Sequence, residues 1–231
     1  MVFKLDKVVP WGRSYVDYCN MFGLRDHDLG LSILDCGGGP ASFNAEMTKM
    51  GNQVISCDPL YHFEKKAIAD RINNTYPSII EGLKTNFDLF VWQDIQIPEE
   101  LGKLRLSAME LFLADFEKGL EQKRYLNQEL PNLSFDSNQF DLALCSHLLF
   151  TYSEQFSYEF HLSSIQEMCR VAKEVRIFPL VDNFTGTPSR HLAPLQQALK
   201  LSDYQLKIAL VKYEFQKGGN QMLVIKKSNE S

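Results

Sequence analysis

The sequence predicts an α/β protein with a doubly wound, mostly parallel sheet, a C-terminal antiparallel hairpin and a helical insertion after the second strand. Three observations predict this fold class. A strand, a glycine turn, a helix and a second strand follow one another between residues 31 and 59. An apolar run over residues 140–145 has the length of a buried parallel strand. Near the C-terminus, an alternating pattern meets a glycine turn and returns as another apolar segment.

The first strand-helix-strand unit begins with the apolar run Leu31–Leu34, which ends at Asp35 and three glycines. Apolar residues then recur at helical spacing over residues 41–50, and a glycine ends that helix. The next strand, Val54–Cys57, ends at Asp58-Pro59, where proline cannot continue a strand. We expect the crossover between these two strands to be right-handed.

The segment between Asp58 and Arg124 is too long for a single crossover. Ile68 and Ile72 recur at helical spacing, and a proline followed by two acidic residues at positions 98–100 opens another helix. We therefore expect residues 61–123 to form a helical insertion that caps a single domain of residues 1–231. An alternative stays open, with two ordinary crossover helices and a strand over residues 89–92.

The rest of the chain alternates strands and helices before it ends in the hairpin. Leu206, Ile208 and Leu210 alternate with polar or small residues, so we expect a strand with one polar face. The apolar phase slips over residues 211–215, which predicts a β-bulge if the strand continues. Residues 216–220 then form the hairpin turn. The other expected elements are strands at 124–126, 140–145, 174–178 and 221–225 and helices at about 153–172 and 192–201.

Composition excludes several classes of protein. The chain has 231 residues, 45% of them hydrophobic, and a formal net charge of -5, so it lacks the basic excess of a general nucleic-acid binder. Its five cysteines form no C-x-x-C pair, so we expect reduced thiols and no metal site. Met1–Asp6 shows no leader pattern, and no stretch approaches the ~20 apolar residues of a membrane span. We expect a soluble cytoplasmic protein with a small-molecule substrate and no membrane partner.

The glycine turn Gly37-Gly38-Gly39 lies between a strand and a helix, where backbone amides can approach a ligand closely. A tight turn without a ligand would look the same. Asp58, 19 residues after Gly39, follows the second strand, where a carboxylate can accept hydrogen bonds from both ribose hydroxyls of a nucleoside. Together these features indicate a nucleoside-containing cofactor, and they leave open whether it is a dinucleotide.

Four segments of the chain resemble the class I S-adenosylmethionine-dependent methyltransferases, in the order of that family's strands. The resemblance runs over about Leu31–Pro59 and again Arg124–Lys227, and Asp35 matches the family's acid before the glycines. It implies a seven-stranded sheet, S-adenosylmethionine as cofactor and methyl transfer as the activity. The four segments are residues 33–39, 54–59, 129–135 and 139–147.

The resemblance also implies which residues bind the cofactor. The glycine turn would face the methionine part, Asp58 the ribose and Pro59 the adenine, while Glu129 and the Leu130 backbone would meet the adenine's polar edge. The backbone at Cys145 and Ser146 would lie near the methionine amino group. Arg13, ahead of the first strand, could pair with the cofactor carboxylate; a solvated arginine is an equal alternative. The expected cofactor-binding residues are Arg13, Asp35, Gly37, Gly38, Gly39, Asp58, Pro59, Glu129, Leu130, Cys145 and Ser146.

Two departures from the family pattern concern the loops. Ala41 replaces the third glycine, and the family's Pro-Gly-Gly turn before the fifth strand is absent. No catalytic residue is assigned: His147 and Tyr152 are the nearest candidates for a base, His62 and Tyr61 are weaker ones, and a structural role is favoured for each. Methyl transfer relies mainly on positioning the acceptor. The alternatives are a non-catalytic S-adenosylmethionine-binding or sensing protein and, with less support, a nicotinamide-dependent oxidoreductase.

Overall fold

The protein is built around one seven-stranded sheet with the strand order β3-β2-β1-β4-β5-β7-β6. The computed structural model describes residues 8–93, 95–183, 185–200, 202 and 204–227. Strands β1 to β5 are parallel, and β7 lies antiparallel between β5 and β6. The predicted fold class is confirmed. The strands are β1 (Ile33–Cys36), β2 (Val54–Cys57), β3 (Tyr125–Leu126), β4 (Phe140–Ser146), β5 (Ala172–Phe178), β6 (Tyr204–Leu210) and β7 (Gln221–Lys227).

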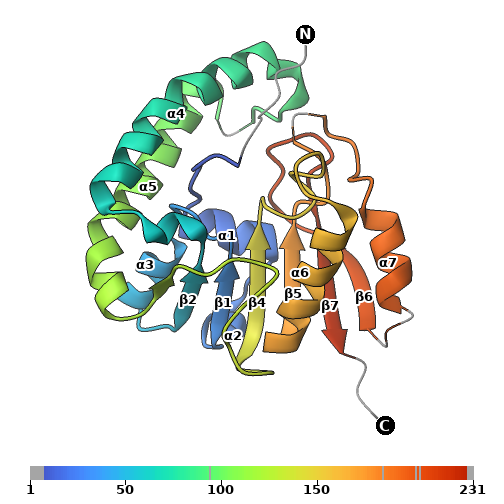
Figure 1. Cartoon of the computed structure of the whole chain (residues 1–231). Helices are drawn as coiled ribbons and strands as arrows, with labels where there is room; N and C mark the ends of the chain where they lie inside the picture. The colour runs from blue at the N-terminus through green and yellow to red at the C-terminus, as the bar shows by residue number, and fades with distance from the viewer. Residues whose placement is uncertain (1–7, 94, 184, 201, 203, 228–231) are drawn as a thin grey trace.

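Helices cover both faces of this sheet (Figure 1). Because successive side chains of a strand point to opposite faces, Ile33 packs toward α1 and α3, and Leu34 packs toward α6. Both are fully buried, as a sheet covered on two sides requires. The helices outside the insertion are α1 (Tyr15–Phe22), α2 (Asp26–Leu29), α3 (Phe43–Lys49), α6 (Tyr158–Val171) and α7 (Leu192–Lys200).

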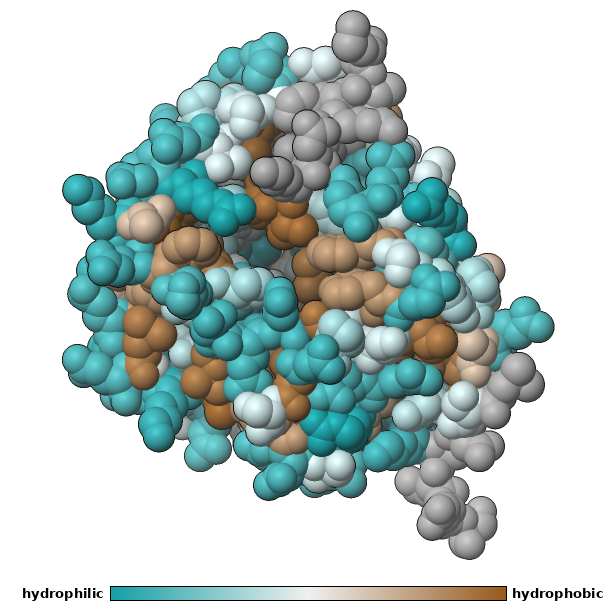
Figure 2. All heavy atoms as spheres, viewed as in Figure 1, coloured by the Kyte–Doolittle hydropathy of each residue, from teal (hydrophilic) through white to brown (hydrophobic). Residues whose placement is uncertain are grey.

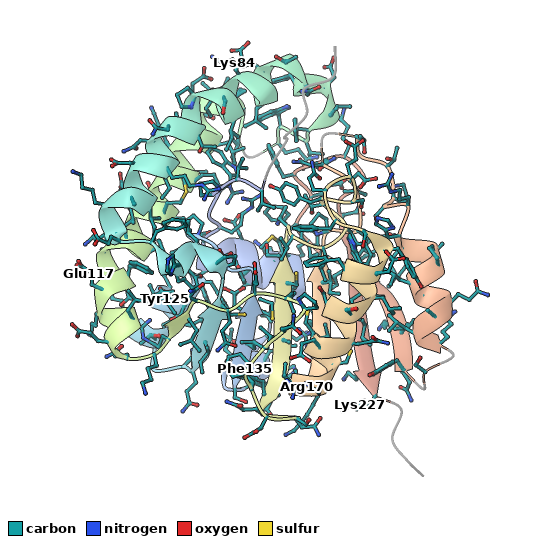
Figure 3. The ribbon with its side chains drawn as sticks, in the orientation of Figure 1. Lys84, Glu117, Tyr125, Phe135, Arg170 and Lys227 are labelled. Atoms are coloured by element: carbon teal, nitrogen blue, oxygen red, sulfur yellow. The ribbon has the colours of Figure 1, made fainter. Side chains whose placement is uncertain are left out.

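Two long helices fill the segment between β2 and β3 and rise beyond the sheet (Figure 1). Tyr125 of β3 anchors the lower part of this insertion, since its ring packs against Phe112 and Phe116 of α5 (Figure 3). Residues 89–92 form no strand, which rules out that alternative; Phe90 makes a single bridge to Gln216. The elements of the insertion are η1 (Pro59–His62), α4 (Lys65–Thr85), η2 (Phe87–Leu89) and α5 (Pro98–Glu121).

The C-terminal hairpin differs from its prediction in two ways. Strand β6 ends at Leu210, so the slip in apolar phase marks the end of the strand and the predicted bulge is wrong. Residues 211–220 form one longer loop, in which the expected turn is closed by Gly219 N–H donating to Gln216 O at 2.8 Å. Strand β6 is an edge strand of the sheet. Leu206 packs on the core, whereas Leu210, at the end of the strand, is 75% exposed.

The remaining differences are small. The helix expected from residue 153 begins at Tyr158, because the Ser157 side chain caps it by accepting the Phe160 N–H at 3.2 Å. Residues 1–7, which include the Met1–Asp6 segment, and Leu201 lie outside the described residues. Within the described part of the chain, no helix combines the length and hydrophobicity needed to cross a bilayer.

Candidate functional site

The glycine turn after β1 is shaped by backbone that side chains would not permit. Gly37 and Gly39 have φ values of +68° and +52°, in the region that favours glycine. A Cβ on Gly38 would stand 2.3 Å from Oδ2 of Asp35, so a side chain there would force the turn away. The Gly37 N–H donates to Cys57 O at 2.8 Å, which fixes the turn against the end of β2.

Asp35 lies beneath this turn and is 1% exposed. Its two carboxyl oxygens accept hydrogen bonds from the hydroxyls of Tyr18 and Ser56, each at 3.0 Å. Burial raises the pKa of Asp35 to about 7. The predicted acid before the glycines therefore links α1 and β2 beneath the turn.

Asp58 stands at the end of β2 and faces the turn. Its Oδ2 accepts the Gly39 N–H at 3.0 Å, and its Oδ1 accepts the Leu60 N–H at 2.7 Å. Burial raises the pKa of this carboxyl, while the two backbone hydrogen bonds oppose the rise. Each carboxylate oxygen retains a lone-pair direction for a further donor.

A cavity of about 260 Å³ opens above the carboxyl ends of the strands, and Figure 2 shows a hollow with hydrophobic residues at its rim on the viewed face. This is the edge at which open α/β sheets bind ligands, where the strand order reverses between β1 and β4. The structure brings seven of the expected cofactor-binding residues together in its lining: Arg13, Gly37, Gly38, Gly39, Asp58, Pro59 and Ser146.

Four expected residues do not line the cavity. Asp35 lies under the glycine turn, and the Cys145 side chain is in the core on the α6 side of the sheet. Leu130 is also in that core, and Glu129 is exposed in the loop after β3. The contacts predicted for the backbone of these residues and for Glu129 stay predictions.

The loop between β3 and β4, which carries Glu129 and Leu130, is held just before β4 by an arginine of α6. Arg170 donates to Phe135 O at 2.8 Å and to Leu133 O at 3.1 Å, and the two labelled side chains lie near one another at the lower edge in Figure 3. The loop is thereby fixed at the end nearest β4, so its position relative to the cavity is set by the fold.

Arg13 is held over the glycine turn by the N-terminal segment. Gly12 lies directly against Pro40, because a Cβ on Gly12 would stand 2.2 Å from Pro40 O, and the Arg13 carbonyl accepts the Ser42 N–H at 3.0 Å. The Arg13 Nε is buried without a hydrogen-bond partner. Asp17, the nearby carboxylate, forms an ion pair with Arg105 instead. The guanidinium of Arg13, whose Nη1 donates to Trp11 O at 2.5 Å, is therefore a partly buried cation without a carboxylate of its own among the described residues.

His147 follows β4 and lines the same cavity. Its Nδ1 lies 2.9 Å from Ser146 Oγ, and its Nε2 has no hydrogen-bond partner among the residues that the structure describes. Burial, with smaller contributions from Arg13 and Arg105, lowers the pKa of His147 well below its usual range. The imidazole is therefore neutral at neutral pH. Tyr152, the other base candidate, accepts the Val9 N–H at 3.3 Å.

Sequence reasoning missed much of the lining. Phe90, Thr151, Asn183 and Phe215 all face the cavity, although they come from four separate segments. No local signal marks them, apart from the length of the loops that carry them.

A contact between buried cysteines was missed as well: Cys36 pairs in register with both Cys57 and Cys145, which places three thiols side by side. Across the described ranges, no three His, Cys, Asp or Glu side chains are arranged to hold a metal ion.

Comparisons with known proteins give one relative by sequence and several by structure. No family model matches the chain. It is 31% identical over 225 residues to the uncharacterized protein MJ0045 of Methanocaldococcus jannaschii. This alignment covers 97% of this chain and 98% of MJ0045. The structure resembles the mitomycin 7-O-methyltransferase MmcR with a TM-score of 0.50 at 12% identity, over 93% of this chain and 54% of MmcR. The structure also resembles magnesium protoporphyrin IX methyltransferase of Synechocystis PCC 6803, with a TM-score of 0.46 at 14% identity. This match covers 88% of this chain and 73% of that enzyme.

Proposed function

Because the chain belongs to the same family as MJ0045 and has the fold of the class I S-adenosylmethionine-dependent methyltransferases, we propose that it binds S-adenosylmethionine and transfers its methyl group to a small molecule. The observation that carries this proposal is the cavity in which the glycine turn, Asp58 and Arg13, a cation without a carboxylate of its own among the described residues, meet. Its five free thiols are in keeping with a reducing compartment, so we propose a cytoplasmic location.

Asp58 and the glycine turn fit two neighbouring parts of this cofactor, the ribose and the methionine. A Cβ on Gly39 would meet only Asp58 Oδ2, at 3.9 Å, so the backbone is open toward the cavity. Asp58 is fixed by two backbone N–H groups and still has acceptor positions for ribose hydroxyls. We therefore assign Asp58 to the ribose and the glycine turn to the methionine side.

Arg13 fits the carboxylate of the methionine part. A partly buried guanidinium without an anionic partner carries a desolvation cost, which a ligand carboxylate would offset through charge-assisted hydrogen bonds. Arg105 does not compete for this role, since it donates to Asp17 and to the Tyr213 hydroxyl, the latter at 2.8 Å. The two arginines thus divide between structure and ligand binding.

S-adenosylmethionine supplies an electrophilic methyl group on a sulfonium when it is bound. The residues of this chain would hold it in place, align the acceptor and exclude water from the cavity, which together account for much of the rate in such a transfer. The cavity volume of about 260 Å³ and its enclosure by several separate segments of the chain favour a small acceptor over a macromolecule.

Calorimetric titration tests this proposal on the wild type and on Asp58→Asn. We expect S-adenosylhomocysteine to bind the wild type, NAD not to bind, and the variant to lose about ten- to a hundred-fold in affinity, since hydrogen bonds to a charged group contribute about 1.5–3 kcal/mol. Asp136→Asn, an exposed site before β4 at the opposite edge of the sheet, is the matched control. Equal affinity in Asp58→Asn would place the ribose elsewhere.

Turnover needs its own measurement. S-adenosylmethionine incubated with the protein and a small-molecule extract should yield S-adenosylhomocysteine and a product heavier by one methylene. Binding without either product in every extract tried would favour the non-catalytic sensor over the enzyme.

A further inference from the structure

The cavity extends well beyond the glycine turn and Asp58. Its far side is bounded by one hydrophobic cluster, which joins the N-terminal segment, the second half of α4 and the loop between β6 and β7. We call this surface the aromatic wall: Val9, Trp11, Ile79, Leu83, Phe90 and Phe215 all belong to that cluster and all line the cavity.

Ring contacts and main-chain hydrogen bonds join the segments of the aromatic wall. The rings of Phe90 and Phe215 are stacked with their centroids 4.8 Å apart. Main-chain hydrogen bonds run beside them, from Val91 N–H to Phe215 O at 2.7 Å and from Lys217 N–H to Leu89 O at 2.9 Å. An apolar surface that contains such aromatic rings favours a planar ring over a flexible chain, because aromatic faces stack at such distances.

The loops after β4 and β5 face the aromatic wall with uncharged polar groups. Thr151 is 7% exposed, and its Oγ1 is buried without a hydrogen-bond partner. Its position is fixed, since its carbonyl accepts the Asn183 N–H at 3.0 Å. A buried hydroxyl without a partner is costly unless a ligand completes it.

Charge is distributed unevenly along the cavity. Among the described lining residues, the acidic side chain is Asp58, at the glycine-turn side, and none accompanies the aromatic wall. Two cationic side chains, Arg13 and Arg71, also line the cavity. A positively charged acceptor would therefore lose its hydration without gaining a counter-ion.

We propose that the methyl acceptor is an uncharged planar ring compound with a hydroxyl group, such as a phenol or enol, held between the aromatic wall and Thr151. This inference rests on the proposed methyltransferase function. The acceptor oxygen forms a bond to the methyl carbon as the sulfur–carbon bond breaks, and the electron pair of that bond stays on sulfur. The hydroxyl proton passes to His147 Nε2, which accepts it in the tautomer whose Nδ1–H donates to Ser146 Oγ.

Calorimetric titration with three matched probes tests the acceptor class on protein saturated with S-adenosylhomocysteine. The probes are 2-naphthol, the cation 2-(aminomethyl)naphthalene and the non-planar decahydro-2-naphthol. We expect 2-naphthol to bind at least tenfold more tightly than either of the others. Equal or tighter binding of the cation or of the decahydro compound, or no binding of 2-naphthol, would overturn the proposal.

Two variants locate the binding surface. Phe215→Ala should weaken 2-naphthol about tenfold, and Thr151→Val should weaken 2-naphthol while leaving naphthalene, which has no oxygen, unchanged. Leu210→Ala, at a side chain 75% exposed on β6, is the control. Wild-type affinity for 2-naphthol in both Phe215→Ala and Thr151→Val would contradict the assignment.

The proposed function and the proposed acceptor class are tested by different measurements. S-adenosylhomocysteine is titrated first, and its failure to bind would count against the proposed function. The ring titrations are repeated without it, so the aromatic wall is tested in either case. Unchanged S-adenosylhomocysteine affinity in the Phe215→Ala and Thr151→Val variants would show that they are folded and that their effect is confined to the acceptor.

Discussion

Asp35 shows how a single residue of the glycine motif can set the pH response of the fold. Its carboxyl is buried and hydrogen-bonded to Tyr18 and Ser56, and burial raises its pKa to about 7. The unfolded chain would titrate it near 3.8. The folded state therefore holds the proton more tightly between these values, and the resulting stability is lost as pH rises from about 4 to 7.

We predict that replacing Asp35 with asparagine removes this pH dependence. Between pH 5 and 7 the wild type should lose about 2 kcal/mol of unfolding free energy from this group, since one pKa unit corresponds to about 1.4 kcal/mol and the loss levels off as the pH reaches the folded pKa. Asparagine keeps the shape without the charge, so the Asp35→Asn variant should show a flatter profile. Urea unfolding at both pH values measures the difference, and identical slopes in the two proteins would assign the effect to another group.

At the level of elements, the insertion is tied to the far edge of the sheet by a short latch, formed by Leu89–Val91 and Phe215–Lys217. Two main-chain hydrogen bonds and the stacked rings of Phe90 and Phe215 make this latch. It closes the aromatic wall over the cavity. Because so few contacts hold it, its opening should require much less free energy than unfolding of the sheet.

We predict that hydrogen exchange separates the latch from the core. The amides of Val91 and Lys217 should exchange faster than that of Ile177, which is fully buried in β5 and pairs with Cys145 of β4 and Leu223 of β7. Phe215→Ala should speed exchange at Val91 and Lys217 and leave Ile177 unchanged. Equal acceleration at all three amides would mean that the variant destabilises the whole fold and that the latch does not open separately.

At the level of the whole molecule, the cavity joins segments from across the chain. Arg13, Asp58, Phe90, His147 and Phe215 all line it, so a ligand there links the N-terminal segment, the insertion and the hairpin. A ligand that binds only the folded state stabilises it by mass action. Its effect should therefore extend to the unfolding of the chain as one unit.

We predict a clear thermal shift with S-adenosylhomocysteine. At a hundred times its Kd the ligand should stabilise the protein by about 2.7 kcal/mol, which corresponds to a Tm increase of about 5–10 °C for a chain of this size. Asp58→Asn at the same ligand concentration should show a smaller shift. An equal shift with NAD would favour the nicotinamide-dependent alternative.

Local patterns in the sequence determined the sheet and its first ligand-binding features. The strands at 33–36, 54–57 and 140–146 follow from short apolar runs, and the turn at Gly37–Gly39 follows from residues that permit positive φ. These signals are local because side-chain periodicity and backbone sterics act over a few residues. The position of Asp58 beside the turn then follows from parallel pairing of β1 with β2.

Only the tertiary structure decided what covers the cavity. Trp11, Phe90 and Phe215 are apolar residues that sequence alone could equally place in the core, and they meet because α4 and α5 bring residue 90 to the loop at 215. Likewise, the sequence does not show that Arg13 lacks a carboxylate partner. This follows only from the structure, in which Asp17 pairs with Arg105 and the Arg13 Nε has no hydrogen bond. Periodicity records which side of an element is buried, whereas the partner it meets depends on contacts between segments far apart in the chain. The glycine-turn side of the cavity was therefore predictable from motifs, and the side formed by the aromatic wall emerged only from packing.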